Sequence, residues 1–138
     1  MDRSDELTGQ LALIHPDLAT DPARKAGQVG IITGAELEYE IIYVGFGRNG
    51  NGIYGTDAVL ILKPNEQITQ SLREHQAELS LNDYKALFQI SLLQELKPST
   101  ANIKTAMSLA LQSETVRNFS MRPVEEALGL RRDQQVQR

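Results

Sequence analysis

The stretch from Gly27 to Leu62 reads GQVGIITGAELEYEIIYVGFGRNGNGIYGTDAVLIL, and it decides the fold. Short apolar and β-branched runs alternate in it with turn residues, which is the pattern of consecutive β-strands. A further short run, Leu11–His15, precedes it and stops at Pro16, because proline lacks the main-chain donor that a strand needs. Five short strands are therefore predicted: Leu11–His15, Gln28–Thr33, Tyr39–Phe46, Ile53–Gly55 and Ala58–Lys63.

Two connections between these strands are distinctive. Arg48-Asn49-Gly50-Asn51-Gly52 contains two Asn-Gly pairs, the strongest short signal for a hairpin turn, and it predicts positive φ at Gly50 and Gly52. Between the first two strands runs HPDLATDPARKAG, residues 15–27, a long loop of the kind that often carries binding residues.

The order of these features resembles the SH3-like barrels, and among them the KOW type. The resemblance covers residues 8–64 and is carried by Gly9, the Gly27-Gln28-Val29-Gly30 entry to the second strand, the hairpin arm Tyr43–Phe46 and the last strand Val59–Leu62. It implies a closed five-stranded barrel. The chain has no tryptophan, whereas peptide-binding SH3 domains use one. The barrel half is acidic, whereas nucleic-acid-binding KOW modules are not.

Helical patterns fill residues 65–130 and predict a compact unit of four or five helices. Ser80, Ser99 and Ser113 each stand where a helix N-cap is expected, and Gly129 stands where the last helix ends. Ile31-Ile32 and Ile41-Ile42 put apolar side chains on both faces of their strands, so we expect the helical unit to pack on the barrel. The fold class predicted is α+β, with residues 1–7 as a mobile arm and 131–138 as a frayed tail.

The composition of the chain limits the classes of function that are compatible with it. The net charge is −4, and residues 1–64 hold nine acidic and five basic side chains, which disfavours binding to phosphate backbones. Cysteine is absent, so disulfides and thiolate chemistry are excluded. The sequence contains no apolar run long enough to predict a membrane span, and a cytoplasmic location is the default expectation for the protein.

No constellation of catalytic residues stands out, and we expect neither an enzyme nor a cofactor. Gly45–Gly50 matches G-x-G-x-x-G, but a strand follows instead of a helix, so the match indicates a hairpin turn and not a dinucleotide site. His15 with Asp17 and Asp21 is compatible with a metal site or a general base, although a histidine packed in the loop is the favoured interpretation.

Two surfaces are candidates for binding. Glu36, Glu38 and Glu40 alternate, which places three carboxylates on one side of an extended segment, and Tyr39 and Tyr54 lie nearby in the sequence. These residues favour a protein-interaction or adaptor module, with a charged, solvated strand edge as the plainer interpretation. The alternative is an accessory nucleic-acid-binding factor of KOW type that uses Arg24, Lys25 and Arg48.

Overall fold

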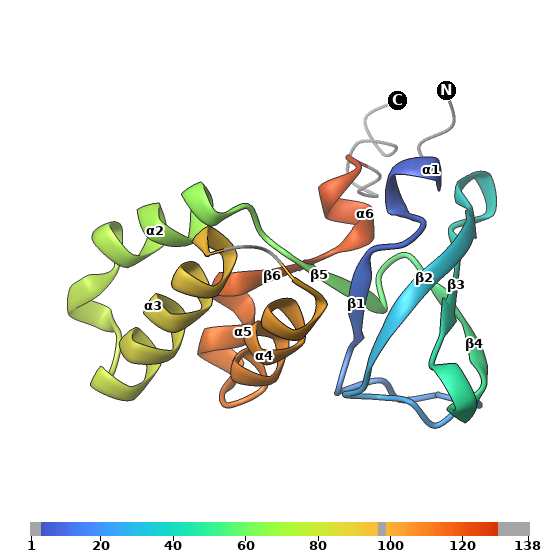
Figure 1. Cartoon of the computed structure of the whole chain (residues 1–138), viewed down its shortest axis with the longest axis horizontal. Coiled ribbons are helices and arrows are strands. Elements are labelled where there is room, and N and C mark those ends of the chain that lie inside the picture. The colour runs from blue at the N-terminus through green and yellow to red at the C-terminus, as the bar shows by residue number, and fades with distance from the viewer. Residues whose placement is uncertain (1–3, 97–98, 130–138) are drawn as a thin grey trace. The chain divides into compact units, whose positions relative to one another are not determined.

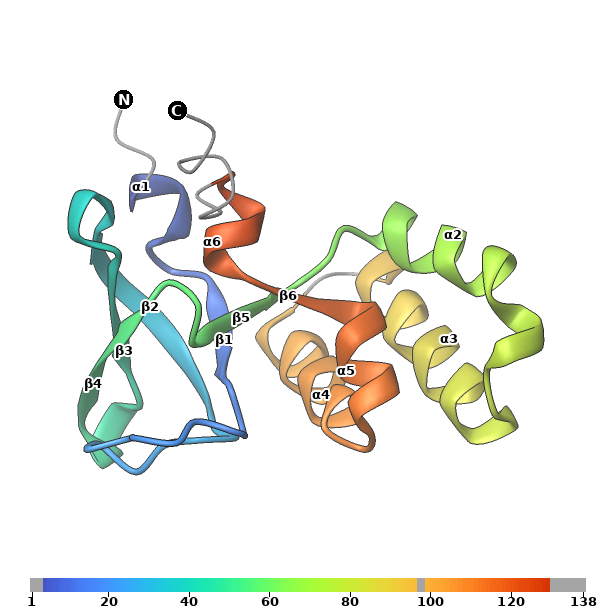
Figure 2. The ribbon, with the colours of Figure 1, turned by 180° about the vertical axis from the view of Figure 1, so that it is seen from behind.

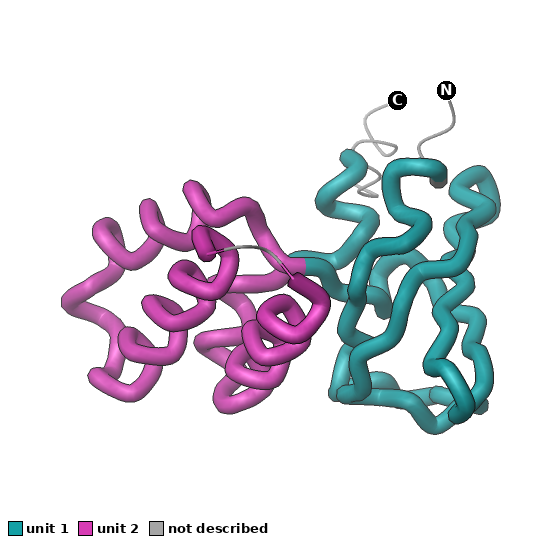
Figure 3. The backbone as a smooth tube through the Cα atoms, viewed as in Figure 1, with its two compact units in different colours: residues 1–61, 122–138 teal, residues 62–121 magenta. Residues whose placement is uncertain are grey.

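A computed structural model describes residues 4–96 and 99–129. The chain divides into two compact units, which are coloured in Figure 3. Unit 1 contains residues 1–61 and 122–138, and unit 2 contains residues 62–121. The sequence assigned residues 65–130 to the helical unit, whereas in the structure the described residues from 122 to 129 belong to unit 1. The predicted frayed tail, residues 131–138, lies outside the described residues. That the helical unit packs on the strands stays a prediction.

Antiparallel strands form the framework of unit 1 (Figure 1). In the part of the chain that the structure describes, the sheet has six strands in the order β4-β3-β2-β1-β5-β6, and it is open. The prediction of a closed five-stranded barrel is therefore wrong in closure and in strand number, because the Met121–Pro123 segment adds a strand beside β5. The strands are β1 (Leu11–Ile14), β2 (Val29–Glu36), β3 (Ile41–Gly45), β4 (Asn51–Gly55), β5 (Val59–Leu62) and β6 (Met121–Pro123).

The five strands predicted from the sequence are present, with shifted ends. β2 runs on to Glu36 because a bulge between Ile32 and Gly34 absorbs one residue, Thr33. The β3–β4 hairpin turns through the 3₁₀ helix η2 (Gly47–Asn49) and closes with Phe46 N–H donating to Gly50 O at 2.8 Å. Gly50 has a φ of 93°, as predicted. The prediction of positive φ at Gly52 is wrong, because this residue lies inside β4.

In its described part, residues 4–7, the N-terminal segment does not form the mobile arm that the sequence predicted. Ser4–Leu7 forms the short helix α1, and Leu7 is buried with 2% of its surface exposed. The chain then reaches β1 through Gly9, whose N–H donates to Ile32 O at 2.8 Å. Leu7 therefore anchors the segment Ser4–Leu7 to the sheet. The sequence did not indicate this, because the neighbours of Leu7 are polar.

The core of unit 1 joins both ends of the chain. Leu7, Ile14, Ile42 and Val59 share one buried cluster with Val124 and Leu128. Val124 is the first residue of α6 (Val124–Ala127) and Leu128 follows its last residue, and Glu125 N–H donates to Thr56 O at 3.1 Å. Figures 1 and 2 show α6 beside α1 from opposite sides. α6 therefore completes the hydrophobic core of the sheet unit.

Unit 2 is helical. Ser80 Oγ accepts from Asp83 N–H, Ser99 Oγ from Asn102 N–H and Ser113 Oγ from Val116 N–H, so the three predicted N-caps are confirmed. Ser91 on α3 also donates to the Asn65 side chain at 2.6 Å and ties α3 to the start of α2. The elements are α2 (Asn65–Glu74), η3 (Gln76–Glu78), α3 (Leu81–Glu95), α4 (Thr100–Ala110) and α5 (Glu114–Ser120).

Helix α3 carries apolar side chains around much of its surface, and only some of them are buried. Leu87 and Ile90 are fully buried, whereas Leu81, Phe88 and Leu96 are exposed. One side of α3 therefore meets the other helices of unit 2, and a second apolar strip faces outward.

We expect Leu128→Ala to destabilise the protein, although the residue lies 66 positions after the last residue of β5. Removing a buried leucine costs about 2 kcal/mol or more of unfolding free energy. Chemical denaturation provides the measurement. Leu81→Ala is the control, because Leu81 is 67% exposed and should change stability by less than about 0.5 kcal/mol. Equal effects of the two substitutions would contradict the placement of Leu128 in the core.

Gly30 and Gly34, both in β2, give a second matched test of the packing. A Cβ at Gly30 would lie 2.6 Å from Val44 Cγ1 and 2.8 Å from Gly45 O, whereas a Cβ at Gly34 would make an ordinary 3.7 Å contact with the Tyr43 ring. Gly30→Ala should therefore cost about 1–3 kcal/mol in overpacking. Gly34→Ala should be neutral or stabilise slightly, because it removes freedom from the unfolded chain. A greater loss of stability at Gly34 would refute this account of β2.

Candidate functional site: a cleft beside the edge strand

The candidate site contains a tyrosine, Tyr54, whose ring packs over a glycine, Gly52. Tyr54 and Gly52 are two residues apart in β4, so their inward-facing positions are neighbours on one face. A Cβ added at Gly52 would lie 2.5 Å from Cε2 of the Tyr54 ring. Glycine therefore leaves the space that the ring occupies. The phenol hydroxyl reaches beyond the strand and donates to Asp21 Oδ1 at 3.0 Å.

Asp21 organises the long loop between β1 and β2. Its carboxylate accepts main-chain N–H bonds from Arg24 at 3.1 Å, Lys25 at 2.7 Å and Ala26 at 2.6 Å. Burial by itself raises the pKa of Asp21, but the hydrogen bonds from Tyr54 and from the three loop amides outweigh it, so the pKa is lowered. The same contact, together with burial, raises the pKa of Tyr54 to about 12. One carboxylate thus ties the loop to β4.

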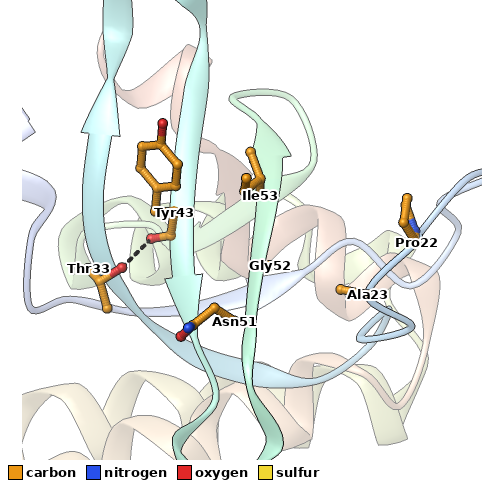
Figure 4. A pocket seen from close by; sticks show the side chains of 7 residues that line it. All are labelled: Pro22, Ala23, Thr33, Tyr43, Asn51, Gly52 and Ile53. Atoms are coloured by element: carbon orange, nitrogen blue, oxygen red, sulfur yellow. Dashed lines mark hydrogen bonds between the residues drawn. The ribbon is translucent and has the colours of Figure 1, made fainter.

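The tied loop forms one wall of a cleft of about 890 Å³. Figure 4 shows β4 between the side chain of Tyr43 on β3 and the loop residues Pro22 and Ala23. Thr33, the extra residue of the β2 bulge, turns its hydroxyl to Tyr43 O at 3.3 Å. The lining consists of Pro22, Ala23, Thr33, Tyr43, Asn51, Gly52 and Ile53.

The outer face of the sheet around the cleft carries exposed apolar side chains. Ile53 on β4 is 65% exposed and Ile31 on β2 is 45% exposed. Tyr43 stands beside Ile53 in the register of β3 and β4. Its pKa is raised by burial and by the hydrogen bond and negative charge of Glu36. The cleft therefore offers an apolar floor with a tyrosine held at its margin.

The predicted protein-binding residues separate into two groups. Glu36 ends β2, Glu38 and Tyr39 lie in the 3₁₀ helix η1 (Leu37–Tyr39), and Glu40 follows with a φ of 58°. The expected alternation along an extended strand is wrong, because the chain turns here. Tyr39 is 67% exposed, whereas Tyr54 is 6% exposed and faces the core, so a partner cannot contact Tyr54 directly.

The predicted basic residues lie at the opposite end of β3 and β4. Arg24 and Lys25 belong to the loop, and Arg48 belongs to η2 in the β3–β4 turn. The Lys25 ammonium lies 5.8 Å from the centre of the Phe46 ring, a cation–π contact that brings the loop to the hairpin. The β3–β4 hairpin therefore has an acidic end at η1 and a basic end at η2.

The two ends share an unusual backbone feature. Arg24, with a φ of 59°, and Glu40, with a φ of 58°, are the non-glycine residues in the left-handed region within residues 4–96 and 99–129. This conformation costs an L-residue about 1–2 kcal/mol and is often retained near functional sites. One lies in the loop beside the cleft and the other ends the turn before β3.

His15 forms a hydrogen bond within its own loop. Its Nδ1 accepts the N–H of Asp17 at 3.1 Å, and Asp21 is bound to Tyr54 and the loop amides. Among the residues that the structure describes, no group of three histidine or carboxylate side chains is placed to hold a metal ion. In the same part of the chain, no helix has the length and apolar character needed to cross a membrane.

The sequence did not single out Gly52, Thr33 or Ile53 as site residues. Gly52 was assigned to a turn because of its Asn-Gly pair, and Thr33 gave no signal of a bulge. Asp21 was considered only with His15, and its link to Tyr54 spans 33 residues. The alternation of Gly52 and Tyr54 on one face was the available signal.

Comparison with family models, curated proteins and solved structures found no match to this chain.

Tyr54→Phe should remove the tie between β4 and the loop. We expect a loss of about 1–2 kcal/mol of unfolding free energy near neutral pH, because a hydrogen bond to a charged group is lost. Asp21, with its lowered pKa, stabilises the fold above the ordinary pKa of about 4 and loses this contribution as the pH falls. Tyr54, with its raised pKa, stabilises the fold below about pH 10 and loses this contribution as the pH rises toward about 12.

The difference in stability between wild type and Tyr54→Phe should therefore be constant from about pH 5 to about pH 9 and shrink on both sides. Denaturant unfolding across the pH range provides the measurement. Tyr39→Phe is the control, because the Tyr39 ring is exposed. A pH-independent difference, or an equal loss at Tyr39, would speak against the Tyr54–Asp21 bond.

Proposed function

We propose that this protein is a non-enzymatic interaction module that binds a protein partner in the cleft beside β4. The observation that carries the proposal is the apolar outer face at the cleft, with Ile53 65% and Ile31 45% exposed. Exposed apolar patches next to a groove mark interaction surfaces more often than incidental exposure. The exposed Tyr39 and the carboxylates of Glu36 and Glu38 extend this surface at the acidic end.

The chemistry of the cleft supports binding over catalysis. Its lining contains one titratable side chain, Tyr43, among proline, alanine, threonine, asparagine, glycine and isoleucine. Acid–base or nucleophilic catalysis needs at least two groups in mutual contact, one of which activates the other. The carboxylate closest to the cleft in the loop, Asp21, is already bound by Tyr54 and main-chain amides. An enzymatic role has no support in this arrangement.

A nucleic-acid partner is the second candidate. Two basic side chains near the β3–β4 turn favour nucleic-acid binding. The Lys25 ammonium lies over the Phe46 ring, and Arg48 belongs to η2 in the turn itself. The competing observation is the excess of acidic over basic side chains in residues 1–64. A phosphate backbone would be repelled by the net negative charge of residues 1–64.

Ile53→Glu provides the first test. Peptides selected from a displayed random library against the full chain should bind the wild type and lose at least about tenfold in affinity with Ile53→Glu, because a charge enters the apolar floor. Leu81→Glu is the matched control, since Leu81 is equally exposed but lies in unit 2. Failure to select any peptide whose binding depends on Ile53 would refute the proposal.

A salt titration distinguishes nucleic-acid binding, the second candidate function, from the proposed protein binding. We expect no saturable binding of mixed DNA and RNA in fluorescence anisotropy at about 50 mM salt. Micromolar binding that weakens steeply by about 200 mM salt is the behaviour of a protein that contacts phosphates. If such binding is also lost on changing Arg24, Lys25 and Arg48 to glutamate, the nucleic-acid function replaces the one proposed.

A further inference from the structure

The strand β4 is a terminal strand of the sheet. Within residues 4–96 and 99–129, its one neighbour is β3, and the order of the sheet places no strand on its other side. A terminal strand presents alternate main-chain N–H and C=O groups that can pair with another chain. Natural proteins usually protect such an edge with charged side chains or proline, whereas the centre of β4 carries the exposed Ile53.

Two hydrogen bonds determine which residues of β4 face outward. Phe46 N–H donates to Gly50 O at one end of the hairpin, and Thr56 N–H donates to Glu40 O at the other. In an antiparallel pair, hydrogen-bonded and non-bonded positions alternate. Gly52 and Tyr54 therefore direct their main-chain groups toward β3. Asn51 and Ile53 direct theirs toward the open edge, and within the described residues these groups have no hydrogen-bond partner.

The cleft lies where these open groups are. Its lining includes Asn51 and Ile53 on the strand and Pro22 and Ala23 on the loop that faces them. An added strand would lie about 4.8 Å from β4 in the direction of the hydrogen bonds. Its side chains would alternate between the outer face, where Tyr43 and Ile53 stand, and the opposite side.

We propose that the partner is an extended peptide segment that adds to β4 as a further strand of the sheet. The inference rests on the proposed function and specifies how the same cleft is used. Main-chain pairing with Asn51 and Ile53 supplies the register, and an apolar side chain of the peptide packs against Ile53 and Tyr43.

Charge specifies the partner further. At the start of β4 stands Arg48, and at its end stands Asp57, close to Gly55, with Glu38 on η1 at the same end of the hairpin. A peptide with a basic residue near Asp57 and an acidic residue near Arg48 would match both ends. The peptide that fits is therefore extended, apolar at its centre and of opposite charge at its two ends.

A peptide fits this edge better than a second copy of the chain does. The outer wall of the cleft is the loop at Pro22 and Ala23, which Asp21 and Tyr54 hold in place. A second copy would have to bring its own loop and sheet between that wall and β4, whereas a single strand needs only one strand spacing.

Amide hydrogen exchange, followed residue by residue by NMR on the full chain, tests the inference. The probe is a peptide selected on the wild type and dependent on Ile53. In the free protein, the amides of Asn51 and Ile53 should exchange fast, and those of Gly52 and Tyr54 slowly. At about 100 times its Kd, the peptide should slow the exchange at Asn51 and Ile53 by about 100-fold. Methylating alternate peptide amides should abolish binding, whereas shifting the methyl groups by one residue should preserve it.

The other outcomes distinguish a failure of strand addition from a failure of the proposed function. If the peptide depends on Ile53 but leaves the exchange at Asn51 and Ile53 fast, strand addition is wrong and the proposed function stands. If no selected peptide depends on Ile53, the proposed function itself is wrong. Slow exchange of both amides in the free protein would overturn the inference, because another part of the chain then covers the edge. The inference would also fail if sedimentation shows self-association that Ile53→Glu abolishes.

Discussion

The hydrogen bond from Tyr54 to Asp21 is the contact on which the arrangement of unit 1 around the cleft depends. It joins the terminal strand to the long loop between β1 and β2, two of whose side chains, Leu18 and Ala23, also pack against the core. Asp21 in turn accepts three loop amides, so one side-chain contact fixes a whole turn of main chain. The geometry needs Gly52, because any side chain there would occupy the volume of the Tyr54 ring. Tyr54 and Asp21, with Gly52 leaving room for the ring, therefore join the loop to β4 at the cleft.

The strands and caps were predictable from the sequence because their signals are local. β-branched runs between turn residues predicted β1 to β5, and serines at helix starts predicted the caps of α3, α4 and α5. The closure of the sheet was not predictable in this way. Whether a sheet closes depends on which segments pair at its ends, and the pairing partner of β5 lies about 60 residues later at Met121–Pro123. Likewise, nothing local indicates that α6 belongs to the core of unit 1.

The candidate site was only partly predictable, for a related reason. The sequence indicated the carboxylates of Glu36, Glu38 and Glu40 and the neighbouring Tyr39, but it placed the three carboxylates on one side of an extended segment. The segment around them has no glycine, proline or asparagine, so the left-handed turn at Glu40 gave no warning. Tyr54 was a candidate for protein binding, whereas its alternation with Gly52 places it in the core. The cleft itself depends on contacts between segments far apart in the sequence, which residue patterns do not record.

The central claim is that the Tyr54–Asp21 contact holds the loop wall of the cleft in place, and a distance measurement tests it most directly. The chain contains no cysteine, so spin labels can be attached to Thr20→Cys in the loop and Glu38→Cys on η1, both exposed positions. Pulsed electron paramagnetic resonance then reports the distribution of distances between the two labels. We predict one narrow distribution with Tyr54 present and a broad one in the Tyr54→Phe background. Narrow, identical distributions in both would contradict the claim, because the loop would then be held by other contacts.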